Sequence, residues 1–367
     1  MRVAIVGTGQ LARMLALAGM PLGLTFTFIQ DNPQGDTNPV EGLGNIVQWS
    51  PEIADADFYA ALGTPDTITF EKEQVDTRLF AVLAQYENVY PSADVLAVCA
   101  NRFQEKQLLN TLNIPNAKFC FANSHEELKA ALVSFDMPVV VKSTTEGYDG
   151  KNQWRLKTTD EVDSIPQSAM NKGVIAEEFI HFTAEASLVG VRDKQGEMKF
   201  YPPTENIHSN GILVRSLAPA PCVNEETAKA MEVYLASILA HKNYVGVLAA
   251  EFFVTPKGIL VNELAPRVHN SGHWTQQGTM TGQFENHIRA IAGLPLGSTQ
   301  AHNVSGMVNV IGMHDAPRHL ISADSTLHWY NKVGKPGRKI GHINFVSNSI
   351  DALNAQMDVV QEQLPVT

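Results

Sequence analysis

Residues 250–273 read AEFFVTPKGILVNELAPRVHNSGH: an extended segment, a short turn, a second extended segment and a polar loop. If residues 256–258 form a three-residue turn, Glu251 faces Glu263 across a hairpin and both carboxylates lie on one face of the sheet. Neighbouring carboxylates repel each other unless a cation lies between them, and Mg²⁺ prefers such hard oxygen ligands. The stretch therefore predicts a magnesium site. A two-residue turn would place the carboxylates on opposite faces, and pairing with arginines is the simpler alternative.

The loop that follows this hairpin concentrates hydrogen-bonding side chains, namely Arg267, His269, Asn270, Ser271 and His273. Such a set suits a small oxyanion. Histidines four residues apart also occur in zinc sites on helices, but the proline, asparagine and glycine of this loop oppose a helix, and no further Cys or His lies nearby. We therefore expect an oxyanion site beside the metal. A polar loop without a ligand is the alternative.

A glycine-containing turn at residues 146–153 joins two extended segments, the first of which ends at Lys142. Its glycines leave backbone N–H groups free to fold over phosphate oxygens, and Lys142 supplies a fixed cation. The Walker A spacing is absent, which disfavours a P-loop enzyme. The turn is therefore a candidate lid over a phosphate group, and an ordinary exposed turn is the alternative.

The N-terminus has a strand, a G-x-G-x-x-A turn at residues 7–12, a helix, and an acid at Asp31 after a second strand. This arrangement occurs in dinucleotide-binding domains. A nicotinamide-dependent dehydrogenase would rest on this turn alone and would leave the hairpin carboxylates unexplained. One alternative is that the two glycines only allow tight packing of helix on sheet. Another is that Gln10 and Leu11 line a site for a smaller phosphorylated ligand.

The composition excludes several classes of function. The 367 residues include 27 Lys and Arg against 38 Asp and Glu, a net charge of −11, which disfavours nucleic acid as a partner. The three cysteines have neither disulfide nor zinc spacing, as expected in a reducing compartment. No apolar run approaches the roughly 18 residues that span a bilayer, and no secretory signal pattern is present. We expect a cytoplasmic protein that contacts no membrane.

One basic concentration stands out in this acidic chain, at residues 332–342. Its cations suit a phosphate monoester, although a solvated loop would have the same composition. They are Lys332, Lys335, Arg338 and Lys339.

Hydrophobic periodicity predicts a combination of α/β and α+β units. Residues 1–95 alternate strand and helix, as in a Rossmann-like domain. Residues 96–295 predict a largely antiparallel domain with a lid hairpin near 143–156. Residues 296–367 predict a small β-rich domain whose terminal helix is capped by Ser349.

The motifs together resemble those of the ATP-grasp enzymes and, among these, the 5-(carboxyamino)imidazole ribonucleotide synthetases, the ATP-dependent carboxylases of purine biosynthesis. The resemblance implies an ATP-grasp fold, an N-terminal domain like that of biotin carboxylase, and a homodimer. Asn152 departs from it, because the family usually has Gly at this position. The last three dozen or so residues match more loosely. The stretches that carry the resemblance are residues 7–14, 105–106, 114–115, 147–151, 262–273 and 336–342, of which 147–151 and 262–273 are the most specific.

The resemblance also implies the reaction. ATP, Mg²⁺, bicarbonate and 5-aminoimidazole ribonucleotide would enter, and the N5-carboxylated ribonucleotide would form through carboxyphosphate. By matching positions, ATP would contact Arg102, Lys142, Gly147, Tyr148, Asp149, Gly150, Lys151, Asn152, Gln153, Glu177, Glu178, Phe179, Ile180, Glu185, His208, Asn262 and Glu263. Magnesium would bind Glu251 and Glu263. The ribonucleotide and bicarbonate would contact Gln10, Leu11, Tyr148, Asp149, Arg267, His269, Lys332 and Arg338, and the catalytic residues would be Arg267, His269, Lys151 and Asp149.

Two further classes compete with this interpretation. A non-catalytic nucleotide-binding regulator could keep the fold, but such proteins tend to lose the metal carboxylates or the lid, and this chain has both. An ATP-grasp enzyme that uses formate to make formylated ribonucleotides is the nearer competitor. The run at residues 269–273 favours bicarbonate, by resemblance alone.

Overall fold

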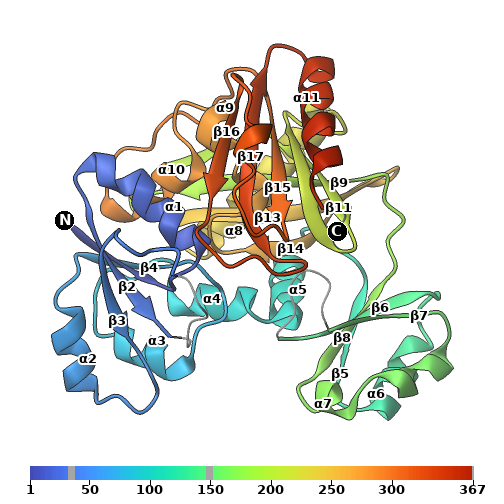
Figure 1. The fold of residues 1–367 in the computed structure, drawn as a ribbon. Coiled ribbons are helices and arrows are strands. Elements are labelled where there is room, and N and C mark those ends of the chain that lie inside the picture. Colours follow the sequence, from blue (N-terminus) through green and yellow to red (C-terminus); the bar gives the residue numbers. More distant parts are fainter. Residues whose placement is uncertain (32–37, 146–151, 366–367) are drawn as a thin grey trace.

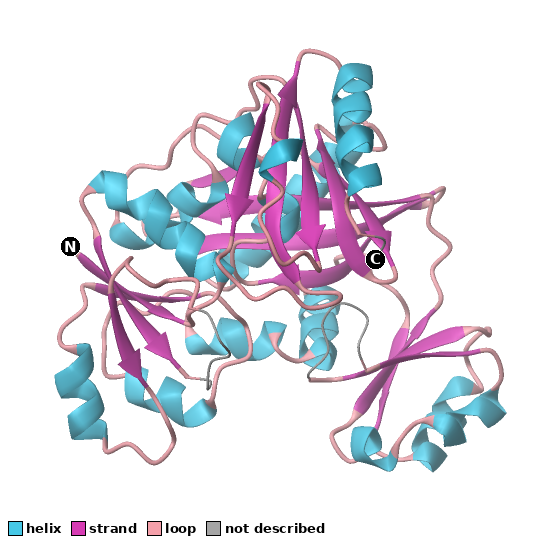
Figure 2. Cartoon of the chain, viewed as in Figure 1, coloured by secondary structure: helices cyan, strands magenta, loops and turns pink. Residues whose placement is uncertain are grey.

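Three β-sheets organise the computed structural model, which describes residues 1–31, 38–145 and 152–365 (Figure 1). One parallel sheet forms the N-terminal lobe, one small antiparallel sheet forms a second lobe, and a large antiparallel sheet lies above both in the view of Figure 2. In the part of the chain that the structure describes, no helix has the length and apolar character needed to cross a bilayer. The mixture of α/β and α+β units agrees with the expected fold class.

The N-terminal lobe is built from strands that alternate with helices. Its elements are β1 (Arg2–Val6), α1 (Gln10–Gly19), the 3₁₀ helix η1 (Met20–Leu22), β2 (Thr25–Gln30), β3 (Asn45–Gln48), α2 (Asp55–Leu62), β4 (Thr67–Phe70), α3 (Thr77–Leu83) and α4 (Ala93–Cys99). The strand order is β3-β2-β1-β4, and all pairs are parallel. Apart from the exposed Arg2, the residues of β1 and β4 are apolar or β-branched and buried on both faces, as parallel strands covered by helices must be. The carboxyl ends of β1 and β4 therefore share one edge, where the 7–12 turn lies.

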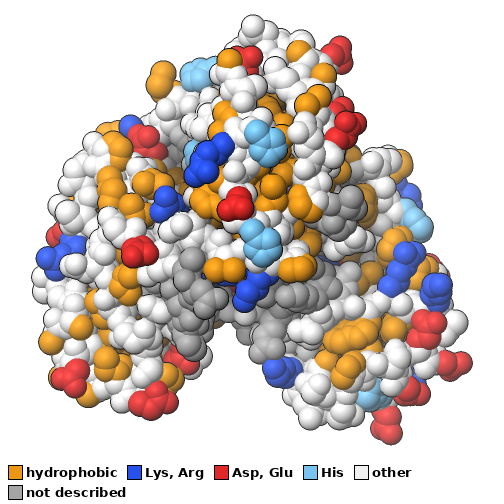
Figure 3. Space-filling view, in the orientation of Figure 1, with side chains coloured by type: hydrophobic (Ala, Val, Ile, Leu, Met, Phe, Trp, Pro, Cys, Tyr) orange, Lys and Arg blue, Asp and Glu red, His pale blue; other side chains and the backbone are white. Residues whose placement is uncertain are grey.

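The second lobe is an antiparallel sheet covered by short helices. Its elements are β5 (Phe119–Ala122), α6 (His125–Leu132), β6 (Val139–Ser143), β7 (Gln153–Leu156), the 3₁₀ helix η2 (Thr159–Ser164), α7 (Gln167–Met170) and β8 (Val174–Glu178). The strand order is β5-β8-β6-β7. The Ser124 hydroxyl caps α6 by accepting a hydrogen bond from Glu127 N, as the capping box predicts. Figure 3 shows the molecular surface hollowed between this lobe and the N-terminal lobe.

The large sheet includes strands from both the middle and the end of the chain. Its elements and covering helices are α5 (Arg102–Thr111), β9 (Ala184–Arg192), β10 (Met198–Phe200), β11 (Thr204–Ser209), β12 (Ile212–Ala218), α8 (Glu225–His241), β13 (Gly246–Thr255), β14 (Gly258–Ala265), η3 (Asn270–Gly272), α9 (Thr275–Gly278), α10 (Gln283–Ala292), β15 (Val304–Ile311), η4 (Arg318–Leu320), β16 (Ser325–Trp329), β17 (Lys339–Ser347) and α11 (Ile350–Gln363). The strand order is β14-β13-β9-β11-β12-β15-β17-β16, with β10 paired to β9. Because β12 pairs with β15, the C-terminal strands continue the sheet that carries the hairpin.

Alternating side chains of β13 pack into two different hydrophobic cores. Val247 and Ala249 lie in the core with α1 and α10, whereas Leu248 and Ala250 lie in the core with α8. This is the two-residue period of a strand that is covered on both faces. The hairpin that begins on β13 is therefore held on both sides, and its distal part, which carries the acidic side chains, is fixed in position.

One hairpin of the large sheet, β11–β12, was not expected from the hydrophobic pattern. Its turn is Asn210-Gly211, with φ values of 49° and 78°. Two consecutive positive φ values are the mark of a type I′ turn, for which Asn-Gly is the preferred sequence. The Asn-Gly dipeptide was thus the signal that could have located this hairpin, which carries His208 and Asn206.

Candidate active site

The two hairpin carboxylates do face each other, but not for the reason the sequence suggested. Thr255 pairs with Gly258, so the turn has two central residues, and the expected three-residue turn is wrong. A two-residue turn alone would place Glu251 and Glu263 on opposite faces. A β-bulge leaves Asn262 without a partner and shifts the register by one residue, so that Glu251 pairs with Glu263. The predicted pairing is confirmed, and the bulge is what produces it.

The electrostatics of this acid pair are those of a site that needs a cation. Burial, together with the neighbouring charge of Glu263, raises the pKa of Glu251 to about 7. His208 lies close by and its Nδ1 is 2.9 Å from Glu185 Oε2. Burial lowers the pKa of His208, but the hydrogen bond and the charge of Glu185 outweigh this, and the net pKa is raised. Two neighbouring carboxylates repel each other when both are ionised, and a divalent cation that binds between them removes this repulsion.

The number of candidate metal ligands is small. Among residues 1–31, 38–145 and 152–365, no group of three or more His, Cys, Asp or Glu side chains is arranged to hold a metal. Glu251 and Glu263 would therefore supply two ligands, and the other ligands would have to come from a bound molecule. Mg²⁺ is commonly held in this way, by one or two carboxylates together with substrate phosphates.

Two lysines meet a buried carboxylate at the ends of β6 and β8. Lys142 Nζ donates a hydrogen bond of 2.6 Å to Glu177 Oε2, and Lys106 Nζ lies 3.6 Å from Glu177 Oε1. Burial would raise the pKa of Glu177, but the two lysines outweigh burial and lower the pKa to about 2. Lys106 also donates to the carbonyl oxygen of Asn262, the bulge residue, at 3.0 Å. Arg102 Nη1 donates to the Ser143 carbonyl at 2.9 Å, beside Lys142.

Lys106 was missed as a site residue in the sequence. It lies on α5 among apolar side chains, and its side chain is almost entirely buried. A lysine at a core-facing helical position is costly unless its charge is paired. The available signal was this core-facing position of Lys106 within the Glu105-Lys106 motif already noted. The structure brings Lys106 to Lys142 and to the hairpin, forming a pair of cations beside the acid pair.

Arg267 reaches across to the N-terminal lobe. Its Nε lies 2.5 Å from Glu73 Oε2, and its Nη2 lies 3.3 Å from Oε1. Burial opposes ionisation of Glu73, but the guanidinium outweighs it and lowers the pKa of Glu73 to about 2. Glu73 was also missed; it follows β4 at the carboxyl edge of a parallel sheet, where ligands commonly bind in α/β proteins. His269 lies on the same side, its Nε2 3.5 Å from Glu251 Oε1.

The first turn and the basic C-terminal segment meet at Gln10. Lys332 Nζ donates a hydrogen bond of 2.8 Å to Gln10 Oε1, although the two residues are 322 positions apart. Burial and the nearby Arg338 lower the pKa of Lys332 to about 8. Leu11 is buried in the core under α1, and Arg338 Nη1 donates to the Val333 carbonyl at 3.1 Å. Lys339 lies within electrostatic range of Glu251, which places it nearer to the acid pair than its position in the basic run suggested.

The helix α1 N-terminus has a protein carboxylate where a dinucleotide would place its pyrophosphate. Glu71 accepts hydrogen bonds from Gly9 N and, at 3.0 Å, from Ala12 N. Asp31, the acid that would hold a ribose, is paired with Lys72 at 2.7 Å. Both features of the dinucleotide pattern are thus engaged in internal contacts. The geometry therefore argues against the dehydrogenase alternative.

The remaining sequence candidates lie around the lid and the end of β8. Asn152 adopts a left-handed backbone with φ 53°, which glycine adopts freely and asparagine tolerates, so the departure from the usual Gly is accommodated. Gln153 pairs with Lys142 in the β6–β7 ladder. Glu178 accepts a hydrogen bond from Lys118 N at 3.0 Å. The centre of the Phe179 ring lies 4.0 Å from the guanidinium carbon of Arg155, and Ile180 is the next residue in the chain. Gly147, Tyr148, Asp149, Gly150 and Lys151 lie outside the described residues.

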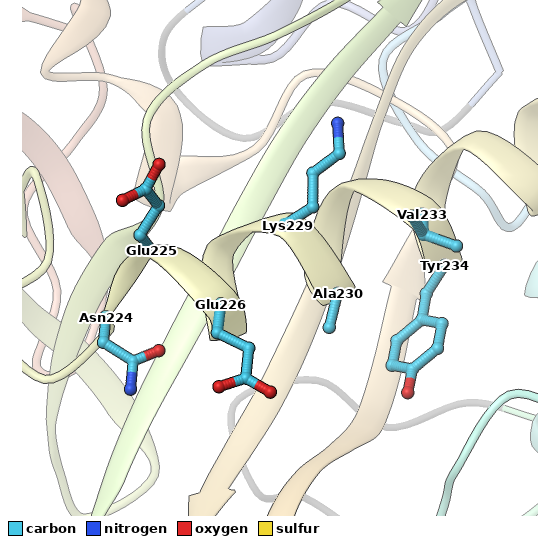
Figure 4. Close-up of a pocket in the computed structure, with 7 residues that line it drawn as sticks. All are labelled: Asn224, Glu225, Glu226, Lys229, Ala230, Val233 and Tyr234. Atoms are coloured by element: carbon cyan, nitrogen blue, oxygen red, sulfur yellow. The ribbon is translucent and has the colours of Figure 1, made fainter.

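A shallow surface hollow on α8 is separate from these groups. Figure 4 shows its lining side chains projecting from consecutive turns of one helix, among them Glu226, Lys229 and Val233. None of its seven lining residues belongs to the acid pair, the lysine pair or the 267–273 loop. The candidate site is therefore the polar assembly at the hairpin and not this hollow.

Comparisons with known proteins cover the whole length of the chain. Residues 1–100 match a family model for the ribonucleotide synthetase preATP-grasp domain, residues 107–284 match the ATP-grasp domain, and residues 305–356 match the phosphoribosylaminoimidazole carboxylase C-terminal domain. The chain is 41% identical over 358 residues to N5-carboxyaminoimidazole ribonucleotide synthase of Vibrio cholerae, covering 95% of this chain and 91% of that protein.

Two solved structures extend the similarity to three dimensions. The N5-carboxyaminoimidazole ribonucleotide synthetase of Thermus thermophilus superposes with a TM-score of 0.91 at 38% identity and covers 100% of this chain and 99% of its own. An Aspergillus clavatus N5-carboxyaminoimidazole synthase in complex with ADP and 5-aminoimidazole ribonucleotide superposes with a TM-score of 0.86 at 27% identity and covers 98% of each chain. The similarity thus includes a structure with both small molecules bound.

Proposed function

This chain belongs to the N5-carboxyaminoimidazole ribonucleotide synthases, ATP-grasp ligases that carboxylate 5-aminoimidazole ribonucleotide in purine biosynthesis, and we propose how its residues divide that reaction among them. The observation that carries the proposal is the juxtaposition of three groups: the acid pair Glu251 and Glu263, the lysine pair at Glu177, and the Arg267–His269 loop. A cation, a triphosphate and a small oxyanion require these three kinds of side chain next to one another.

The lysine pair and Arg102 bind the triphosphate of ATP. Lys142 and Lys106 are held by Glu177 at fixed positions, so that cations are in place before phosphate arrives. The chain from Glu177 to Ile180, at the end of β8, lines the adenine. Glu185 and His208, which lie 2.9 Å apart, orient the ribose or the phosphates from the neighbouring strands β9 and β11. The lid residues 147–151 are assigned to ATP by resemblance alone.

Glu251 and Glu263 are the residues that would hold Mg²⁺, with the remaining ligands supplied by the bound nucleotide. The fit rests on chemistry in this chain: the half-buried Glu251 and the more exposed Glu263 are paired by a bulge, and burial together with the charge of Glu263 raises the pKa of Glu251 to about 7. When bound, Mg²⁺ supplies positive charge to the phosphoryl oxygens during transfer. His208 and Lys339 border the pair and limit how much negative charge it presents without a cation.

The loop at 267–273 holds the one-carbon unit. An oxygen of bicarbonate attacks the γ-phosphorus of ATP, the bond to the ADP oxygen breaks, and carboxyphosphate forms. Arg267 binds this anion and His269 donates a hydrogen bond to it, while Glu73 fixes the guanidinium from the other lobe. Carboxyphosphate then breaks into phosphate and CO₂. The exocyclic amine of the ribonucleotide attacks the carbon of CO₂ and loses a proton to the released phosphate. Asp149 and Lys151 are proposed to close over this step and keep water away.

The ribonucleotide lies where the N-terminal lobe meets the C-terminal strands. The hydrogen bond between Lys332 and Gln10 joins these two parts of the chain. Lys332 and Arg338 would receive the phosphate monoester, and the backbone around Gln10 and Leu11 would line the ring. Tyr148 is assigned to this site by resemblance.

A cytoplasmic homodimer remains our prediction. Sedimentation of the purified protein tests the homodimer.

One assay tests the reaction directly. ADP release is measured with ATP, Mg²⁺ and 5-aminoimidazole ribonucleotide while bicarbonate is varied, and the rate should rise with bicarbonate until saturation. Glycinamide ribonucleotide or formate should not replace the proper substrates. A rate that ignores bicarbonate would refute carboxylation, and a higher rate with formate would favour the formate-using alternative.

A further inference from the structure

A chain of buried hydrogen-bonding side chains runs through the large sheet and ends on the His269 ring. Ser216 Oγ donates to Asn206 Oδ1 at 3.0 Å, and Asn206 Nδ2 donates to Ser187 Oγ at 2.9 Å. Ser187 Oγ lies 2.7 Å from Ser271 Oγ, which in turn lies 2.9 Å from His269 Nδ1. The first three residues belong to the adjacent strands β12, β11 and β9. We call these four residues, Ser216, Asn206, Ser187 and Ser271, the relay.

The relay is isolated from water. Ser187, Ser216 and Ser271 have no exposed surface, and Asn206 is 5% exposed. A buried hydroxyl or amide that lacks a partner costs about 1–3 kcal/mol, so each member is bound to make its bonds. Polar side chains in a sheet that is otherwise packed with apolar residues therefore form a connected set with few alternative arrangements.

The backbone fixes the state of the ring at the end of the relay. Ser271 N lies 3.4 Å from His269 Nδ1 and can only donate, so Nδ1 is an acceptor and carries no proton. The Ser271 hydroxyl must then also donate a hydrogen bond to Nδ1, because Nδ1 has no proton to donate in return. A neutral imidazole without a proton on Nδ1 has its proton on Nε2. That nitrogen is the one that lies 3.5 Å from Glu251 Oε1.

The rest of the relay is consistent in direction. Because the Ser271 hydroxyl donates its hydrogen bond to the ring, Ser271 Oγ must accept a hydrogen bond from the Ser187 hydroxyl. Ser187 Oγ accepts a hydrogen bond from the Asn206 amide and donates its own to Ser271. The Asn206 oxygen in turn accepts a hydrogen bond from Ser216. Every bond thus points from the sheet toward the ring.

We propose that Ser271 is a positioning residue which, supported by Ser187, Asn206 and Ser216, holds His269 in the Nε2–H tautomer, so that the ring presents an uncharged hydrogen-bond donor to the bicarbonate-derived anion between Arg267 and the acid pair. This inference rests on the proposed function of the 267–273 loop. The other tautomer would aim a lone pair at the anion and repel it. His269 therefore stabilises the oxyanion as a donor and transfers no proton.

The kinetic test uses alanine variants along the relay. Ser271→Ala should lower kcat/KM for bicarbonate roughly 10–100-fold, by analogy with the loss found when side chains that orient metal-binding histidines are removed. Ser187→Ala should have a smaller effect and Ser216→Ala the smallest, while KM for ATP stays unchanged. Ser305→Ala is the matched control, because the Ser305 hydroxyl is buried on β15 and has no hydrogen-bond partner among the described residues. Equal losses in all four variants would overturn the proposal.

A double-mutant cycle separates positioning from a merely structural role. Glutamine places an amide donor where Nε2 lies, and asparagine places one where Nδ1 lies, so His269→Gln should keep more activity than His269→Asn. In the His269→Gln background, Ser271→Ala should cost little further, because no Nδ1 remains to be oriented. If Ser271→Ala costs the same in both backgrounds, Ser271 acts only on the fold and the proposal fails.

A spectroscopic readout keeps the inference separate from the reaction itself. In ¹⁵N-histidine-labelled protein without substrates, the His269 signal, assigned by its loss in His269→Gln, should show an unprotonated Nδ1 and a protonated Nε2. Ser271→Ala should shift the ring toward a mixture of tautomers. A proton on Nδ1 in the wild type would refute the inference even if the enzyme carboxylates normally. The expected tautomer in a protein without bicarbonate-dependent activity would instead refute the proposed function.

Discussion

Glu177 is a buried carboxylate and Glu251 a half-buried one in the same site, and their pKa values move in opposite directions. The pKa of Glu251 rises to about 7 because burial and the negative charge of Glu263 act in the same direction, and that of Glu177 falls to about 2 because Lys142 and Lys106 outweigh burial. Burial alone would raise both. The charge of Glu177 is therefore already balanced by lysines of the protein. The negative charge of Glu251 and Glu263 is balanced only when a cation binds.

The largest effect should come from removing one member of the incomplete pair. Glu263→Gln should lower turnover by about 10²–10³-fold, because one metal carboxylate is lost at a centre of phosphoryl transfer. It should not destabilise the protein in the absence of Mg²⁺, because the repulsion at Glu251 disappears. Steady-state kinetics and thermal unfolding would show both results. Near-normal turnover at saturating Mg²⁺ would contradict the metal assignment.

The completed pair of Arg267 and Glu73 should behave in the reverse way. Arg267→Ala should abolish or uncouple carboxylation, and it should also destabilise the fold. The loss should be smaller than the about 3–5 kcal/mol that breaking a fully buried ion pair on one side costs, because the Arg267 and Glu73 side chains are 20% and 28% exposed. Replacing both partners, as in Arg267→Met with Glu73→Gln, should recover much of the stability but none of the activity. Urea unfolding measures the first quantity and product formation the second. Normal product formation by Arg267→Ala would show that this guanidinium does not hold the one-carbon unit.

The two kinds of carboxylate should also leave opposite signs in the pH dependence of stability. Glu177 and Glu73, with pKa values lowered to about 2, stabilise the fold above pH 4.5, and this contribution is lost as the pH falls toward 2. Glu251, whose pKa is raised to about 7, binds a proton in the folded state that the unfolded chain has already lost, so its contribution declines as the pH rises from 4.5 through 7.

The comparison of wild type with Glu251→Gln isolates the second sign. Between pH 5 and 8, without divalent cations, the wild type should lose stability relative to the variant. Adding Mg²⁺ at pH 8 should raise the melting temperature of the wild type and leave the variant unchanged. A parallel pH dependence of the two proteins would show that the acid pair is not strained.

The smallest effect is expected at Asn152, the turn residue just before β7, whose first residue Gln153 pairs with Lys142. Asn152→Gly should leave turnover within about twofold and change stability by less than about 1 kcal/mol, because both residues accept the φ of 53°. Asn152→Ala provides the matched contrast, since alanine is strained in that conformation. A large loss of activity in Asn152→Gly would mean that the asparagine side chain, and not only its backbone, serves the lid.

How far each part of the site could be predicted depends on how local its cause is. The Ser124 cap and the β-branched β1 follow from nearest neighbours in sequence, and both were expected. The Asn210-Gly211 hairpin had an equally local signal that hydrophobic alternation did not detect. The turn at Gly258 was predicted one residue too long, and the correct pairing of the carboxylates appeared only because a bulge at Asn262 offset that error.

The sequence by itself determined most of the elements and their order, apart from the β11–β12 hairpin, together with the family resemblance and the residues of the 251–263 hairpin and the 267–273 loop, because periodicity, caps and motifs act over a few residues. Only the tertiary structure decided that Arg267 meets Glu73, 194 residues away, that Lys106 turns inward to Glu177, and that four polar side chains on separate segments align toward His269. The physical reason is that register, burial and the charge of a neighbour are set by how sheets and lobes pack, and no local pattern encodes them.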